Sequence, residues 1–135
     1  MSDFDVGFVV AIHDEIIERF GGLPGFAGGG IGAVEAAITR IDNHAFYAGL
    51  DDVFGIAALY AEAIARGHVF NDGNKRTALT CAITYIEQQG FHVKRDPVLE
   101  DATVLLAEGG LTAEDFAWSL SVLSLYPDGT PLVDF

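Results

Sequence analysis

Residues 68–86 read HVFNDGNKRTALTCAITYI, and the two parts of this stretch differ in character. The first part, from His68 to Arg76, combines an imidazole, a carboxylate, amides and two cations. The second part, from Leu79 to Ile86, is mostly apolar and predicts a helix that is buried around most of its circumference. The polar residues should therefore lie on the loop and first turn of a helix whose body is held in the core.

The amino-terminal end of this helix is expected to attract anions. The first N–H groups of a helix have no intrahelical acceptor and lie at the positive end of its macrodipole. Lys75 and Arg76 add two cations there, although the chain has only 7 Lys and Arg in all. A phosphate is the natural ligand, with His68 as a proton acceptor and Asp72 as an oxygen ligand for Mg²⁺. The stretch predicts a phosphoryl- or nucleotidyl-transfer site.

Each of these residues also has a structural interpretation, and the residues alone leave both open. Lys75 and Arg76 can be ordinary surface charge on a helix. His68 can be a hydrogen-bonded histidine at the end of a loop. Asp72 can be the N-cap of the helix, which would use the same carboxylate oxygens as a metal ion.

Spacing excludes two other kinds of site. A P-loop has a Ser or Thr directly after its lysine and joins a strand to a helix. Here Asn74 separates Gly73 from Lys75, Thr77 does not directly follow Lys75, and the context is helix–loop–helix. A zinc site would need Cys or further His residues at ligand spacing, and the sequence around His68 has none.

Size and composition indicate one domain spanning residues 1–135, with a core at about 3–125 and an irregular tail at 126–135. The formal net charge of −13 argues against a nucleic-acid partner, which would require a basic face. Cys81 lies in the apolar stretch and is expected to be a small buried residue. A basic secretory start and a membrane-spanning run are both lacking, so a cytoplasmic protein with no membrane partner is expected.

Hydrophobic spacing and breaker residues predict an all-α fold, a compact bundle of about six helices. These helices are expected at about residues 3–20, 31–47, 53–66, 74–89, 97–108 and 112–125. The most apolar of them, at 74–89, should be the central helix. Short extended pieces are possible near 46–50 and 91–95. Ser2 or Asp3, Asp96 and Thr112 are the expected N-caps.

The first helix is predicted to bury one apolar stripe, consisting of Phe8, Ile12, Ile16 and Phe20. His13 lies at the edge of this stripe among acidic residues and is expected to be a solvated or capping-range side chain rather than a ligand. His44 falls off the stripe of the second helix and should lie near the surface or a groove.

The motif formed by residues 68–78 resembles that of the Fic/Doc superfamily, and specifically that of the death-on-curing (Doc) toxins of toxin–antitoxin systems. The Doc pattern is H-x-F-x-[D/E/N]-[A/G]-N-K-R-x-A, and it is matched by His68, Phe70, Asp72, Gly73, Asn74, Lys75, Arg76 and Ala78. The stretches 13–14 and 19–25 also resemble the first helix and following turn of Doc proteins. The resemblance covers roughly residues 8–125 and implies the Fic/Doc fold.

The chain departs from the Fic enzymes that transfer AMP, whose pattern is H-x-F-x-x-G-N-G-R-x-x-R. Lys75 replaces the second glycine, and Leu79 replaces the second arginine. A glycine lets the backbone approach the phosphates closely, whereas a lysine fills that space and adds a cation. In Doc proteins this replacement accompanies nucleotide binding in the reversed orientation and transfer of the γ-phosphate. The resemblance implies a protein kinase; an AMP transferase and a non-catalytic binding module are the alternatives.

The resemblance also implies a role for each motif residue. His68 would be the general base that takes the proton from a Ser or Thr hydroxyl. Asp72 would act in catalysis by holding Mg²⁺ and orienting the base or the target, and Phe70 would fix the loop to the core. The phosphates of ATP would be held by Gly73, Asn74, Lys75 and Arg76.

Partners are implied by the resemblance alone. Doc toxins are inhibited by an antitoxin whose C-terminal helix lies in a groove on the toxin. Their target is elongation factor Tu, so the expected outcome is arrest of translation. An internal inhibitory helix with the signature S/T-x-x-x-E-G/N is not found in the sequence, because Val104 stands four residues before Glu108. Inhibition by a separate antitoxin is therefore expected.

Overall fold

A computed structural model describes residues 5–48 and 52–133 of the chain. Within these residues the fold consists of six helices and two short strands, which confirms the all-α class. The elements are α1 (Val6–Phe20), α2 (Ile31–Ala48), α3 (Val53–Gly67), α4 (Asn74–Gln88), β1 (His92–Val93), α5 (Pro97–Glu108), α6 (Ala113–Val122) and β2 (Ser124–Leu125). The helix bounds agree with the sequence prediction to within about three residues.

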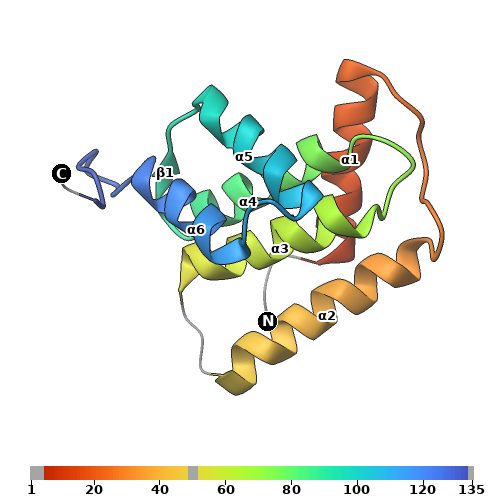
Figure 1. The fold of residues 1–135 in the computed structure, drawn as a ribbon, viewed down its shortest axis with the longest axis horizontal. Coiled ribbons are helices and arrows are strands. Elements are labelled where there is room, and N and C mark those ends of the chain that lie inside the picture. Colours follow the sequence, from red (N-terminus) through yellow and green to blue (C-terminus); the bar gives the residue numbers. More distant parts are fainter. Residues whose placement is uncertain (1–4, 49–51, 134–135) are drawn as a thin grey trace.

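The helices α3 and α4 form the centre of the bundle (Figure 1). On one side α1 packs against α4 and α2 packs against α3, while α5 and α6 cover the other side. Ala78, Cys81, Ala82 and Ile86 of α4 are completely buried, as expected for a central helix. In the described part of the chain no helix combines the length and hydropathy needed to cross a bilayer.

Side chains cap most of the helices. Asp96 and Thr112 are N-caps as predicted, since they accept hydrogen bonds from the backbone N–H groups of Val98 and Asp115. The predicted cap of the first helix is wrong. Asp5 takes this role by accepting a bond from the N–H of Phe8, whereas Ser2 and Asp3 lie outside the described residues.

The extended segments were only partly predicted. The piece near 91–95 is confirmed as β1, which pairs antiparallel with β2. The last helix ends at Val122 instead of Leu125, because Ser124 and Leu125 pair with β1. Residues 46–48 belong to α2, so the extended piece predicted there is wrong, and 49–50 lie outside the described residues.

The buried face of α1 also differs from the prediction. Ile16 is buried as predicted, and Phe8 and Ile12 are partly buried, but Val9 and His13 are also buried and Phe20 is 57% exposed. Steps of four residues advance about 400° around a helix, so a stripe built only from them drifts off one face. Positions 9, 13 and 16 follow the period of 3.6 residues more closely. His13 is therefore a core residue, and the prediction that it is solvated is wrong.

Candidate functional site

His68 stands at the junction between α3 and the motif loop. It is the C-cap of α3 and adopts the left-handed backbone conformation, with φ 47° and ψ 49°. Among the described residues it is the only non-glycine with a positive φ. This conformation costs free energy for a residue with a Cβ atom. Its side chain is exposed, and within the described part of the chain its ring has no hydrogen-bond partner. The imidazole is thus available to a ligand.

The loop after His68 is attached to the core and to the segment after α1. Phe70 is 2% exposed, and its ring stacks on His13 with 3.7 Å between centroids. The predicted role of Phe70 as an anchor is confirmed. The N–H of Ala27 donates to the carbonyl of Val69 at 3.1 Å, and the N–H of Asn71 donates to the carbonyl of Gly25 at 3.0 Å. These bonds form a short antiparallel bridge that fixes the loop from outside.

Asn74 closes the loop from inside. Its side-chain Oδ1 accepts from the N–H of Phe70 at 3.0 Å, and its Nδ2 donates to the carbonyl of Phe70 at 2.9 Å. Both ends of the amide are therefore bonded to the main chain of one residue. The side chain of Asn74 braces the loop, and its backbone N–H lies in the first turn of α4.

Asp72 is exposed and is not the N-cap of α4. Gly73 is the N-cap, with φ 75° and no side-chain cap. The Asp72 carboxylate accepts from the N–H of Gly73 at 3.2 Å and from the N–H of Leu23 at 3.2 Å. The second bond joins the motif to the turn after α1. A Cβ atom on Gly22 would lie 3.0 Å from Asp72 Oδ2, so a glycine there allows this close approach.

The first turn of α4 is positively charged, whereas the first turn of a helix usually carries negative charge. Acidic residues are favourable near the positive end of the dipole, but this turn has none and carries the cations of Lys75 and Arg76. Both side chains are exposed, and the Arg76 guanidinium lies over the ring of Phe20 at 4.5 Å. Cations at an uncapped helix start are unfavourable without a bound anion.

His68, Asp72 and the first turn of α4 line one depression of about 430 Å³. All six predicted site residues lie in its wall, together with Ala65 and Asn71. The amino-terminal end of α4 is therefore open to solvent and not covered by the core. Asp72 is the only acidic residue in this wall within the described chain.

A Mg²⁺ ion would fit the available donors. Within the described residues, no cluster of three or more His, Cys, Asp or Glu side chains forms a metal site made only of protein ligands. Mg²⁺ is usually held by one or two carboxylates together with water and the phosphates of a substrate. The Asp72 carboxylate, beside the cationic amino-terminal end of α4, meets that requirement.

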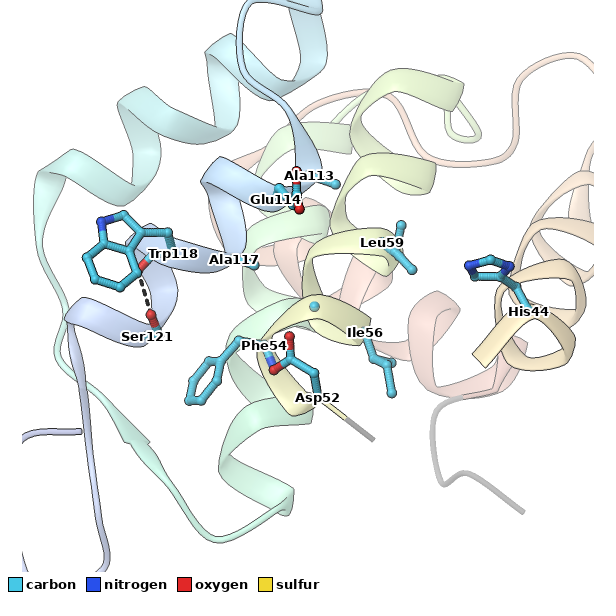
Figure 2. Close-up of a pocket in the computed structure, with 11 residues that line it drawn as sticks. His44, Asp52, Phe54, Ile56, Leu59, Ala113, Glu114, Ala117, Trp118 and Ser121 are labelled. Atoms are coloured by element: carbon cyan, nitrogen blue, oxygen red, sulfur yellow. Dashed lines mark hydrogen bonds between the residues drawn. The ribbon is translucent and has the colours of Figure 1, made fainter. Parts of the chain in front are cut away.

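A groove runs along α3, beside the depression. It consists of two hollows of about 580 Å³ and 420 Å³, which share His44 and Leu59 in their walls. Figure 2 shows the larger hollow, with His44 of α2 on one side and Trp118 of α6 on the other. The smaller hollow extends to Gly67, directly before His68. The prediction that His44 lies near the surface or a groove is confirmed.

The fold and the motif together define the class of protein. A bundle whose central helix presents H-x-F-x-D-G-N-K-R at its amino-terminal end is typical of Fic/Doc proteins, and the Fic/DOC family profile matches residues 3–86. The chain belongs to this family. A relative from Escherichia phage P1, named Protein kinase doc, is 41% identical over 112 residues, which cover 83% of this chain and 87% of the relative.

Proposed function

We propose that this chain is the toxin of a toxin–antitoxin system and acts as a Mg²⁺- and ATP-dependent protein kinase. It would transfer the γ-phosphate of ATP to a Ser or Thr hydroxyl of a translation factor in the cytoplasm, with elongation factor Tu as the expected target. The observation that carries the proposal is the uncapped, cationic amino-terminal end of α4, which opens into one depression with His68 and Asp72. The name of the phage P1 relative supports a kinase.

The reaction requires a base and an anion site close together. The hydroxyl oxygen would attack the γ-phosphorus, the bond from phosphorus to the β–γ bridging oxygen would break, and ADP would leave. His68 would take the hydroxyl proton as the general base. The exposed ring at the mouth of the depression can meet a protein substrate without a change in the core.

Positioning and electrostatics would supply most of the catalysis, because charge in phosphoryl transfer is spread over the phosphate oxygens. The N–H groups of the first turn and the side chains of Lys75 and Arg76 would hold these oxygens. Gly73 lets the backbone enter this turn with φ 75°. The braced loop keeps the donors fixed before the substrate arrives, so little reorganisation is needed during the reaction.

Mg²⁺ held by Asp72 would neutralise charge that develops on the phosphates. The carboxylate is already oriented by the N–H groups of Gly73 and Leu23. Asp72→Ala should therefore lose both the metal ligand and the link to the turn after α1.

The test is transfer of label from ATP to purified elongation factor Tu. Label in the γ position should reach the target protein, and the modified peptide should gain the mass of one phosphate. His68→Ala should abolish transfer while keeping the helical circular dichroism spectrum. Transfer of label from the α position alone would instead identify an AMP transferase. Growth arrest that is unaffected by His68→Ala would favour a binding module.

The groove along α3 is the proposed site for the inhibitory helix of an antitoxin. Its larger hollow is lined mainly by apolar side chains, and its smaller hollow combines Ile41, Leu59 and Ala63 with Arg40, His44, Glu62 and Arg66. The smaller hollow ends at Gly67, so a helix bound in the groove would end next to His68. The net charge of −13 favours a partner segment with basic residues.

Binding in the groove is tested with an antitoxin gene selected from the source genome by its ability to restore growth. Ala63→Arg, in the groove wall, should abolish this rescue and leave toxicity intact. Val104→Arg is a matched control, since Val104 is 37% exposed on α5 and outside both hollows. Equal rescue of the two variants would place the antitoxin elsewhere.

A further inference from the structure

We propose that His13 is a positioning residue of the site and fixes the orientation of the peptide group between Asp72 and Gly73. The inference rests on the proposed function, because this orientation affects catalysis only if the amino-terminal end of α4 binds phosphate. His13 lies on α1, far from the motif in sequence, and its side chain is 1% exposed.

The contact between His13 and the loop has one chemical interpretation. His13 Nε2 lies 2.7 Å from the main-chain carbonyl oxygen of Asp72. A carbonyl oxygen only accepts hydrogen bonds, so Nε2 must carry the hydrogen and donate it. The other ring nitrogen, Nδ1, lies 3.5 Å from the carboxylate of Asp14. The ring is held in place by its stacking on Phe70, with only 6° between the ring planes.

This bond determines where the two ends of the peptide group point. In a trans peptide the C=O and N–H groups point in opposite directions. With the Asp72 carbonyl directed at His13, the N–H of Gly73 is directed away from α1 and donates to the Asp72 carboxylate. The N–H therefore lies on the side of the depression, and the carbonyl lies on the side of the core.

At Gly73, backbone sterics do not select this orientation. Rotation of the peptide group by about 180° would change the φ of Gly73 from 75° to a negative value, and glycine accepts both. The rotated peptide would turn the Asp72 carbonyl oxygen towards the depression. A partial negative charge would then face the proposed phosphate site. The hydrogen bond from His13 prevents this arrangement.

The test compares two substitutions of His13. His13→Phe keeps an aromatic ring against Phe70 but has no donor. His13→Gln has an amide N–H at a similar reach and can restore the bond to the Asp72 carbonyl. His92→Gln is the matched control, because His92 is exposed on β1 and outside the depression. For each protein, kcat and the KM for ATP are measured by γ-phosphate transfer, and the backbone amide signal of Gly73 is recorded by NMR.

In His13→Phe we expect kcat/KM for ATP to fall about 10- to 100-fold, with a higher KM, because a displaced donor set binds phosphate less well. The Gly73 amide signal should shift, and His13→Gln should restore most of both readouts. A lower folded fraction alone would reduce kcat and leave KM unchanged. Wild-type kinetics or an unshifted Gly73 signal in folded His13→Phe would overturn the proposal. A lower kcat with an unchanged KM for ATP would overturn it too, because it would indicate only a loss of folded protein.

Two observations on the wild-type chain keep this test independent of the kinase assay. The ¹⁵N signals of the His13 ring should show the hydrogen on Nε2, and a bare Nε2 would refute the proposal even if His13→Phe does not fold. If the wild-type chain transfers no phosphate, the proposed function fails. The tautomer and the Gly73 signal still decide whether His13 holds the peptide group.

Discussion

The amide of Asn74 should be worth more to stability than any other polar side chain of the loop. Asn74→Ala removes the two bonds to the main chain of Phe70, at 3.0 and 2.9 Å. Each is expected to contribute about 1 kcal/mol, and the partly buried groups left on Phe70 add to the cost. A loss of about 2–3 kcal/mol follows, which for a chain of this size lowers Tm by roughly 6–15 °C.

Urea and thermal denaturation followed by circular dichroism measure this loss. Asn71→Ala is the matched control, because its side chain makes one exposed bond, from Nδ2 to the carbonyl of Pro24 at 3.1 Å. That variant should lose only about 0.5 kcal/mol. If Asn74→Ala cost no more than Asn71→Ala, the brace would be unimportant. A loss of phosphate transfer without any loss of stability would instead favour direct phosphate binding by the Asn74 side chain.

Three further predictions concern single residues. His68→Gly should raise stability by roughly 0.5–1 kcal/mol in urea denaturation, because glycine adopts the left-handed backbone more easily, and should abolish transfer. Lys75→Gly should lower γ-phosphate transfer roughly 100-fold in the labelled-ATP assay, because a cation beside the phosphates is lost. Burial raises the pKa of the Cys81 thiol, so thiol reagents should modify Cys81 only after unfolding, as mass spectrometry of native and denatured protein would show.

The sequence predicted the helices well because their signals are local. The apolar period, the glycines at breaks and the caps at Asp96 and Thr112 all act within one or two turns. The pairing of β1 with β2 was missed because two-residue strands form only where distant segments meet, and Ser124 and Leu125 have a pattern that also fits a helix end.

The same distinction applies to the site. The six predicted site residues were found because they lie within nine positions of one another, and all six line one depression. The contributions of α1 and the turn after it were missed because they cross the fold. His13 bonds to the Asp72 carbonyl, the N–H of Leu23 bonds to the Asp72 carboxylate, and Phe20 lies under Arg76. The one sequence signal for His13 was its position between Val9 and Ile16 at the helical period. A polar residue at such a position usually lies at the edge of the apolar face, so the signal did not indicate a buried histidine.

The acidity of the chain should affect how fast the proposed substrate ATP reaches the site, because a nucleotide is negatively charged too. Lys75, Arg76 and the helix dipole would act within a few ångströms of the proposed phosphate, whereas most of the charge of −13 lies farther away. Screening acts mainly on distant charges, since the Debye length is about 30 Å at 0.01 M salt and about 8 Å at 0.15 M. Raising salt over this range should therefore remove long-range repulsion before it weakens the local contacts. We expect the association rate of ATP, measured by stopped-flow with a fluorescent analogue, to rise with salt. A rate that falls with salt would mean that the local cations determine the field that an approaching nucleotide meets.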